Sequence, residues 1–384
     1  MALLKKKEFE QLANVKSKYC VSIFIPTHRA GKEVIESHDR LKLKKKTQEL
    51  ENSLEEKGLN GREREPYISN LKKLLDDSDF WRHQSDGLSV FITKDDFKYY
   101  SLPLYFDEFI YISEEFYLKP LLNLFNTDKK FFMLGLSLHD TKLYEATKYE
   151  IEQLEVEAFT PENLIDTVGG DFKEKVLQMR TGQTGMDGAM YHGHNMAKDF
   201  KEEEVEKYLR NVDKGLNEVL REEKAPLVIF GDKNIANTFK NLSNYKYIHN
   251  NILSPNANNV DLFFLHEKAK ELLQDYFEKE FQEKMNQFPE LHRKGKASDA
   301  LNEIIPASLN GKIDTLFVKQ GEILPGKVDE NELKIEIDSE ITDDNQCLLN
   351  LAAIQTFKQG GKVYVLHKND MPGNKKTANA IYRY

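Results

Sequence analysis

The densest group of residues that could do chemistry lies in one glycine-rich stretch, residues 181–198. Residues 181–195 read Thr-Gly-Gln-Thr-Gly-Met-Asp-Gly-Ala-Met-Tyr-His-Gly-His-Asn and show no apolar periodicity. Such a stretch buries too little surface to offset the conformational entropy of its glycines. We therefore predict a mobile loop that delivers polar side chains to the N-terminus of a following helix. Long irregular loops that persist inside compact domains are often functional.

Two imidazoles and two amides give this loop its chemical character. The candidate catalytic residues are His192, Gly193, His194 and Asn195, with Gln183 as a second amide. Imidazole exchanges protons near neutral pH, and a side-chain amide can hold a carbonyl oxygen or a water molecule by hydrogen bonds. The loop is thus the predicted working segment of the protein.

Metal binding is the alternative reading of the two histidines. In an extended loop the rings of His192 and His194 point the same way, and Asp187 or Asp199 could complete a zinc site. No third ligand stands at a diagnostic spacing, so we predict no bound metal. The sequence contains no phosphate-loop, dinucleotide-binding or nucleophile-elbow motif, and we predict no cofactor.

Composition restricts the class of protein. The chain has 384 residues and a formal net charge of −9, which disfavours indiscriminate binding to nucleic acid. Cys20 and Cys347 stand alone in apolar surroundings, as expected in a reducing compartment. No apolar run approaches the length of a membrane span, and the N-terminus becomes charged too early for a signal peptide. We expect a cytoplasmic protein with no membrane contact.

Local basic residues are the candidate contacts with nucleic acid. Arg180 and Lys198 flank the glycine-rich loop, and Arg293, Lys294 and Lys296 form a second group. Taken alone, such a cluster is more typical of a solvated helix face.

The order of predicted elements gives an α/β (α+β) multidomain chain with three blocks. We predict an N-terminal α/β domain with a mixed sheet at 1–127, a middle domain at 128–296 and a C-terminal α/β sandwich at 297–384. In the first block we expect strands at 20–26, 88–92 and 99–104, and helices at about 33–57 and 67–75.

The middle block opens with a predicted antiparallel meander of strands at 131–138, 142–147 and 151–156. A helix should begin at Asp199, which can cap it, and end before Pro226. A buried strand at 227–230 and a long amphipathic helix at about 260–286, closed by Pro289, complete this block. In the C-terminal block, helices are expected at 300–308 and 346–358, and strands at 315–318, 362–366 and 380–383.

This order of features resembles the archaeal and eukaryotic peptide-chain release factors, their relative Pelota, and especially their bacterial homologues. The resemblance covers roughly residues 130–384, and no single motif is diagnostic. It depends on four features in sequence: the strand–His-Asp-Thr–strand unit at 131–147, the loop with Tyr-His-Gly-His at 191–194, the run Ala-Pro-Leu-Val-Ile-Phe-Gly at 225–231, and the C-terminal runs at 311–317, 348–353, 360–365 and 380–384.

The resemblance implies a middle domain of ribonuclease-H-like topology and a C-terminal domain similar to the ribosomal L30e/L7Ae fold. It also implies the ribosome and tRNA as partners, with a protein partner for the C-terminal domain. In release factors a Gly-Gly-Gln loop helps water attack the ester of peptidyl-tRNA. This chain has no Gly-Gly-Gln; Gly193-His194-Asn195 stands before the helix, and Gly182-Gln183 lies upstream. It also lacks the Asn-Ile-Lys-Ser motif with which eukaryotic factors read stop codons.

Three functions therefore compete. The first is a translation-associated factor of the release or ribosome-rescue type that hydrolyses a peptidyl-tRNA ester through the 181–198 loop. The second is a non-hydrolytic, Pelota-like factor that binds the ribosome or tRNA. The third is an unrelated metal-dependent hydrolase that uses the His-Gly-His run.

Overall fold

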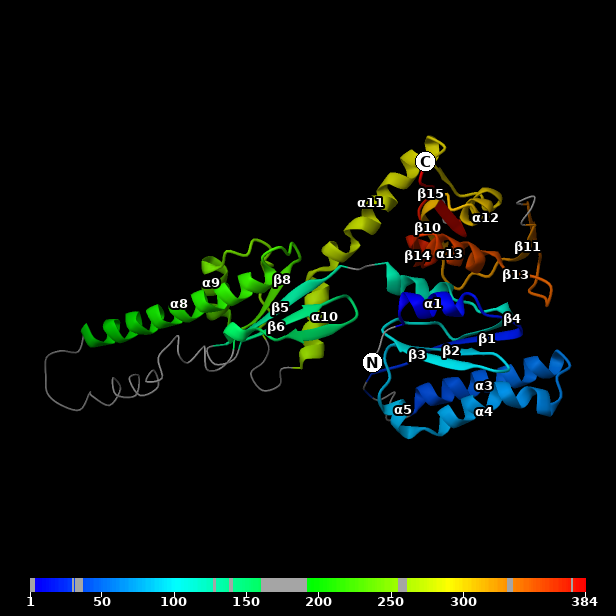
Figure 1. Cartoon of the computed structure of the whole chain (residues 1–384), viewed down its shortest axis with the longest axis horizontal. Helices are drawn as coiled ribbons and strands as arrows, with labels where there is room; N and C mark the ends of the chain where they lie inside the picture. Colours follow the sequence, from blue (N-terminus) through cyan, green and yellow to red (C-terminus); the bar gives the residue numbers. More distant parts are fainter. Residues whose placement is uncertain are drawn as a thin grey trace. The chain divides into compact units, whose positions relative to one another are not determined.

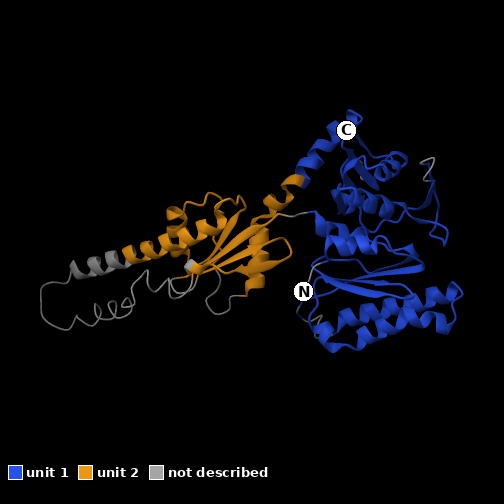
Figure 2. Ribbon diagram, viewed as in Figure 1, with its two compact units in different colours: residues 1–126, 281–384 blue, residues 127–280 orange. Residues whose placement is uncertain are grey.

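A computed structural model describes residues 4–29, 31, 37–126, 129–137, 141–159, 192–254, 261–329, 334–373 and 376–384. The chain forms two compact units, the first comprising residues 1–126 and 281–384 and the second residues 127–280 (Figure 2). The N-terminal and C-terminal parts of the chain thus lie in one unit. The three predicted domains divide the chain differently from these two units, and their boundaries stay a prediction.

The N-terminal part of unit 1 is a four-stranded sheet in the order β3-β2-β1-β4, with α3 and α4 on one face (Figure 1). Its elements are α1 (Lys6–Leu12), β1 (Lys16–Pro26), α3 (His38–Glu56), α4 (Gly61–Asp76), α5 (Ser78–Arg82), β2 (Gly87–Ile92), β3 (Phe97–Leu102), β4 (Phe109–Glu115) and the 3-10 helix η1 (Lys119–Phe125). Each of its strand pairings is antiparallel, so the predicted mixed sheet is wrong. The sheet is antiparallel because β2, which forms a tight hairpin with β3, pairs antiparallel with one side of β1. The strand β4, which the sequence did not predict, pairs antiparallel with the other side.

The C-terminal part of unit 1 contains the mixed sheet β14-β10-β15-β9 and the small sheet β12-β11-β13. Its elements are β9 (Ala297–Ser298), α12 (Leu301–Leu309), β10 (Ile313–Lys319), β11 (Pro325–Asp329), β12 (Lys334–Ile337), β13 (Gln346–Cys347), α13 (Leu348–Lys358), β14 (Lys362–Leu366), η3 (Lys368–Asp370) and β15 (Ala378–Tyr382). The predicted helices and strands of this block are confirmed. Gly360, at φ 78°, ends α13 in the left-handed conformation that glycine adopts without strain.

A buried polar joint connects the two parts of unit 1. The Asn350 side chain on α13 accepts hydrogen bonds from the backbone N–H groups of Leu118 and Lys119, at 2.8 and 3.0 Å. Its amide nitrogen donates to the Phe116 carbonyl at 3.0 Å. The Lys119 side chain is fully buried, and its Nζ donates to the carbonyl oxygens of Lys319 (2.9 Å) and Glu322 (2.7 Å). These contacts satisfy polar groups that burial would otherwise leave unpaired.

Unit 2 is a sheet in the order β7-β6-β5-β8 between two layers of helices. Its elements are β5 (Phe131–Leu136), β6 (Thr141–Ala146), β7 (Ile151–Leu154), the short 3-10 helix η2 (Glu157–Phe159), α8 (His192–Leu220), β8 (Leu227–Gly231), α9 (Lys233–Leu242), α10 (Leu262–Leu272) and the start of α11 (Gln274–Arg293). The β5–β6–β7 meander is antiparallel as predicted, and β8 adds in parallel to β5.

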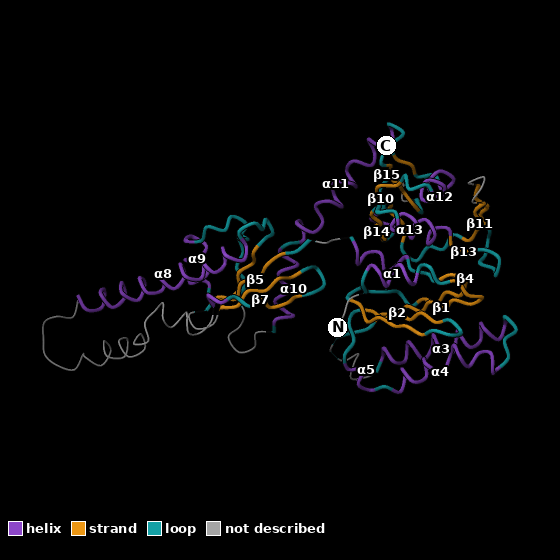
Figure 3. Tube along the Cα trace, in the orientation of Figure 1, coloured by secondary structure: helices purple, strands orange, loops and turns teal. Residues whose placement is uncertain are grey.

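Strand β5 shows why this sheet has a helix layer on each face. Its residues alternate, with Phe132, Leu134 and Leu136 packing toward α8 and α9. Phe131 and Met133 pack toward α10 and α11. Alternation of side chains along a strand places successive residues on opposite faces, so this apolar run covers both. The resulting layers of helix and strand can be followed in Figure 3.

The helix predicted at 260–286 is instead two helices, α10 and α11, separated at Leu273. Buried Leu273 packs with α10 in the core of unit 2. The predicted stop at Pro289 is also wrong, because α11 continues through this proline to Arg293. Phe281, Met285, Phe288 and Leu291 of this helix pack against one hydrophobic cluster of unit 1. Tertiary packing on both sides of the proline thus outweighs the hydrogen bond that it removes.

These arrangements confirm a multidomain α/β protein. The ribonuclease-H-like and L30e/L7Ae-like topologies remain predictions. In the described part of the chain, no helix combines the length and apolar composition that crossing a membrane requires.

Candidate functional site

Helix α8 is the element that carries the predicted working segment. Apolar residues three or four apart line one of its faces and enter the core beside β5. These residues are Val205, Tyr208, Leu209, Val212, Leu216 and Leu220. The thirteen residues before Val205 add about 20 Å of helix at 1.5 Å per residue. In Figure 1 this part of α8 continues past the sheet of unit 2.

A buried tyrosine fixes α8 to the sheet. The Tyr208 hydroxyl donates to the carbonyl oxygen of Ser137, just after β5, at 2.5 Å. The Thr141 hydroxyl, at the start of β6, lies 2.5 Å from the same oxygen of Tyr208. Because the tyrosine proton is used toward Ser137, Thr141 donates the second bond. Tyr208 therefore holds α8 to both sides of the β5–β6 connection.

A second tie lies at the other end of α8. Lys130 donates to the carboxylate of Glu223 at 2.7 Å and lies 3.5 Å from Glu145. The hydrogen bond that Lys130 donates to Glu223 raises the pKa of Lys130. Tyr245, whose pKa burial raises to about 12, donates to the Ala225 carbonyl at 2.6 Å. These bonds fix the segment that follows α8 against the strands.

The predicted catalytic residues fall at the beginning of α8. His192, Gly193, His194 and Asn195 form its first turn, and Lys198 lies in the next. The helix thus begins seven residues before the predicted cap Asp199, and residues 192–198 are not loop. Apart from Gly193, this run contains no strong helix breaker, and propagation of an existing helix costs little.

The early start of α8 also removes the basis for paired histidine rings. The shared direction of His192 and His194 was predicted for an extended loop, whereas residues two apart on a helix do not share a face. Gln183, Arg180 and Asp187 lie outside the described residues. The rest of the predicted loop, 181–191, lies there too, as do His139 and Asp140 of the predicted turn.

The second basic group lies in unit 1, at the end of α11. Arg293, Lys294 and Lys296 are all exposed. Lys294 pairs with Glu290 at 2.5 Å, and this hydrogen bond lowers the pKa of the Glu290 carboxyl. Arg293, Lys294 and Lys296 belong to unit 1 and Lys198 belongs to unit 2, while Arg180 lies outside the described residues, so their joint role stays a prediction.

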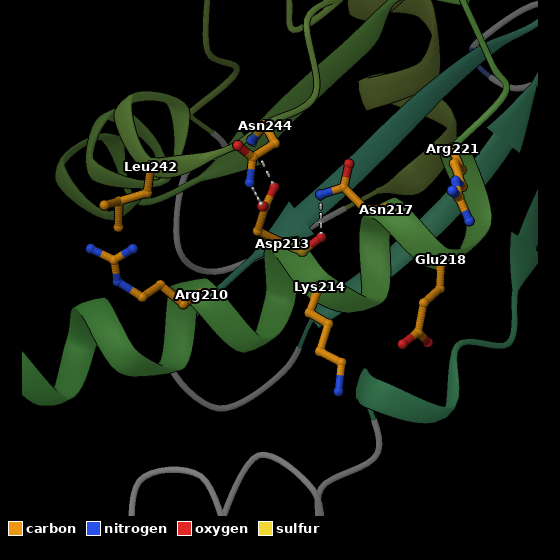
Figure 4. Close-up of a pocket in the computed structure, with 8 residues that line it drawn as sticks. All are labelled: Arg210, Asp213, Lys214, Asn217, Glu218, Arg221, Leu242 and Asn244. Atoms are coloured by element: carbon orange, nitrogen blue, oxygen red, sulfur yellow. Dashed lines mark hydrogen bonds between the residues drawn. The ribbon is translucent and has the colours of Figure 1, made fainter.

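An open pocket of about 680 Å³ lies on the outer side of α8, where the end of α9 approaches it (Figure 4). It is lined by Arg210, Asp213, Lys214, Asn217, Glu218, Arg221, Leu242 and Asn244. Sequence reasoning missed this pocket. A signal was available: cationic residues recur at helical spacing on the face opposite the apolar residues of α8.

The Asp213 carboxylate fixes the wall of this pocket. Asp213 is only 6% exposed and accepts hydrogen bonds from the Ser243 hydroxyl (2.6 Å) and the Asn244 backbone N–H (3.1 Å). The Asn244 side-chain amide donates a further bond of 2.8 Å. Asn217 donates to the Asp213 carbonyl at 2.7 Å. The one buried acid of the pocket is thus bound by neutral donors, and it forms no ion pair with a described cation.

Metal binding finds no support among the described side chains. None of them forms a group of three or more His, Cys, Asp or Glu residues that could hold a metal ion. The side chains of His192 and His194 are not among those described, so the metal alternative stays a prediction.

Comparison with known proteins finds a family match for the central part of the chain. Residues 131–275 match the bacterial archaeo-eukaryotic release factor family 7. None of the curated proteins matches this chain. Among solved structures, an archaeal translation termination factor is similar at 13% identity, covering 99% of both chains with a TM-score of 0.25. Pelota of Archaeoglobus fulgidus is similar at 14% identity, covering 78% of this chain and 79% of that one, with a TM-score of 0.35.

The family match confirms the resemblance predicted from the sequence. Residues 131–275, which contain α8 and the glycine-rich stretch, match the release-factor family, and this match supports a relation to translation. The solved structures are too distant, by identity and TM-score, to transfer a site or an activity.

Proposed function

We propose that this protein is a cytoplasmic translation factor of the release or ribosome-rescue type, which binds the ribosome and acts on peptidyl-tRNA through residues 181–198. The observation that carries the proposal is the position of this segment. Its last seven residues, 192–198, begin a helix that is anchored to the core from Val205 onward, within the residues that match the release-factor family.

The N-terminal part of α8 suits the delivery of polar groups to a distant target. A helix anchored at one end transmits its position along its length, while the glycines before it permit close approach of the backbone. The first N–H groups of a helix have no partners within the helix, and its N-terminus carries partial positive charge. Such an environment stabilises the negative charge that develops on a carbonyl oxygen during attack on an ester.

In this scheme the side chains around the helix start orient the attacking water. Asn195 and Gln183 supply amide groups for the water or the carbonyl, and His192 or His194 accepts a proton. Arg180 and Lys198 contact phosphates of the bound RNA. The reaction adds water across the ester, releasing the peptide as a carboxylic acid and leaving the tRNA with its free hydroxyl.

A non-hydrolytic factor is the second candidate, and the absence of Gly-Gly-Gln favours it. One of the similar solved structures is an archaeal Pelota described as ribosome-bound with ABCE1, at 13% identity and a TM-score of 0.35, covering 78% of this chain and 77% of that one. Under this alternative the protein occupies the ribosome, and the 181–198 segment contacts RNA without cleaving the ester.

One pair of assays separates the candidates. Ribosomes loaded with labelled peptidyl-tRNA are incubated with the wild-type protein and with a variant in which residues 181–191 are replaced by a Gly-Ser linker of equal length and His192, His194 and Asn195 by alanine. The hydrolytic proposal predicts peptide release by the wild type, loss of release in the variant and equal pelleting of both with ribosomes. Equal release by both proteins contradicts it. Pelleting without release by the wild type supports the non-hydrolytic factor.

Metal analysis of the purified protein tests the third function. Stoichiometric zinc or manganese, lost when His192 and His194 are replaced by alanine, would favour the metal-dependent hydrolase. The present proposal predicts substoichiometric metal in both proteins.

A further inference from the structure

The outer face of α8 carries a row of cations. Lys207, Arg210 and Lys214 of α8 are three and four residues apart, and Arg221, the first residue after α8, follows at seven, so the four lie on one side of the helical path. All four are exposed. The apolar residues that bind α8 to the sheet occupy the opposite side. The row spans about 21 Å along the helix axis at 1.5 Å per residue.

Three of the four cations form no ion pair with a described residue, although the exposed acids Glu203 and Glu218 lie one helical turn from Lys207 and Lys214. Arg210 lies 3.7 Å from Glu206, one helical turn away. Lys207, Lys214 and Arg221 form no ion pair with a described residue. Glu218 is the exposed acid in the lining of the adjoining pocket. The second acid, Asp213, is buried and saturated by Ser243 and Asn244.

The pocket adds neutral polar groups beside the cations. Figure 4 shows Arg210, Lys214 and Arg221 extending from α8, with the amides of Asn217 and Asn244 near Asp213. The Asp213 bonds hold the end of α9 against α8, so this wall is fixed before any ligand arrives. A surface of fixed amides and extended cations suits phosphate and ribose groups better than an apolar partner.

We propose that Lys207, Arg210, Lys214 and Arg221, with the pocket between α8 and α9, form an RNA-binding face that contacts the phosphate backbone. This inference rests on the proposed function and names a contact for it that is separate from the 181–198 segment. The net charge of −9 repels a polyanion from the chain as a whole, so attraction requires a local row of cations. Backbone contacts of this kind position RNA without reading its sequence.

Binding to a short RNA duplex, followed by fluorescence anisotropy over a salt series, tests this face. The variant is Lys214→Glu with Arg221→Glu. The control is Lys72→Glu with Lys279→Glu, which changes the net charge equally at exposed lysines of α4 and α11. A second variant, Lys214→Arg with Arg221→Lys, retains the charge. Circular dichroism verifies that all variants are folded.

The proposal predicts that the Lys214/Arg221 reversal weakens duplex binding on the order of tenfold at low salt. The slope of log affinity against log salt should fall by about 1.4 to 1.8, corresponding to two lost phosphate contacts. The control reversal and the charge-retaining variant should bind like the wild type, apart from a small uniform effect of net charge. Equal weakening in both reversals, unchanged binding in the Lys214/Arg221 reversal, or no duplex binding by the wild type overturns the proposal.

Pelleting with ribosomes distinguishes this inference from the proposed function. If the wild type binds the duplex through this face but does not pellet with ribosomes, the face is supported and the translational function fails. If the wild type pellets with ribosomes and the Lys214/Arg221 reversal pellets equally well over the whole salt series, the function stands and the face is rejected.

Discussion

The Tyr208 hydroxyl on α8 donates a 2.5 Å hydrogen bond to the carbonyl oxygen of Ser137, at the end of β5. Through this bond the helix that carries the predicted working segment is fixed to the central strand of unit 2. Thr141, at the start of β6, bonds to the same hydroxyl. The Tyr208 hydroxyl thus connects α8 to the sheet where β5 leads into β6.

Replacing Tyr208 by phenylalanine should destabilise unit 2 by about 1–2 kcal/mol, because the buried Thr141 hydroxyl and the Ser137 carbonyl lose their hydrogen bonds to it. Urea unfolding followed by circular dichroism measures the change. Tyr247→Phe is the matched control, since Tyr247 is 42% exposed and the same hydroxyl is removed. Equal stabilities of the two variants would show that the Tyr208 bonds contribute nothing.

The Asn350 joint makes a prediction for unit 1. Asn350→Ala leaves the N–H groups of Leu118 and Lys119 and the carbonyl of Phe116 without their side-chain partner. Burial of these groups should cost about 2–4 kcal/mol of stability. Lys358→Ala, at an exposed position on the same helix, should change stability by less than about 0.5 kcal/mol. A urea titration that finds the two variants alike would contradict the joint.

Lys119 predicts a dependence of stability on pH. Burial lowers the pKa of Lys119 to about 8, from 10.5 in the unfolded chain. Below pH 8 both states bind the proton. Between these two values the unfolded state retains it while the folded state releases it, so the free energy of unfolding rises with pH. The slope is at most about 1.4 kcal/mol per pH unit.

The comparison with Lys119→Met isolates this effect. Burial also raises the pKa of Tyr111 to about 12 and that of Cys20 to about 12, and both groups reduce stability at alkaline pH. They are present in both proteins and cancel in the difference. Between pH 8 and 10.5, the free energy of unfolding of the wild type, relative to that of the Met variant, should therefore rise by about 2–3 kcal/mol. Parallel stability curves would show that Lys119 keeps an ordinary pKa.

The sequence predicted those parts of the fold whose local pattern agrees with their packing. The apolar run at 131–136 and the periodic residues from Val205 to Leu220 gave a strand and a helix that the structure confirms. The hairpin of β11 and β12 was missed because β12 (Lys334–Ile337) is largely exposed and has little apolar signal. Helix α9 was missed in an Asn-rich run, although Asp232 caps it through Asn234 and Ile235.

The candidate site was predictable only in part. The family resemblance located the segment before α8, but the helix start at His192 depends on cooperative extension of a helix that tertiary packing anchors. The α8–α9 pocket requires Asp213 to meet Ser243 and Asn244, thirty residues away. No local sequence pattern predicts this long-range contact. From the sequence alone, the cations of α8 therefore look like an ordinary solvent-exposed helix face.

Sedimentation of this protein with purified bacterial ribosomes through a sucrose cushion measures its association with the ribosome. We expect the protein to pellet with ribosomes at low salt and to be released progressively as the salt concentration rises. A protein that stays in the supernatant at every salt concentration, with ribosomes both empty and carrying peptidyl-tRNA, would contradict it.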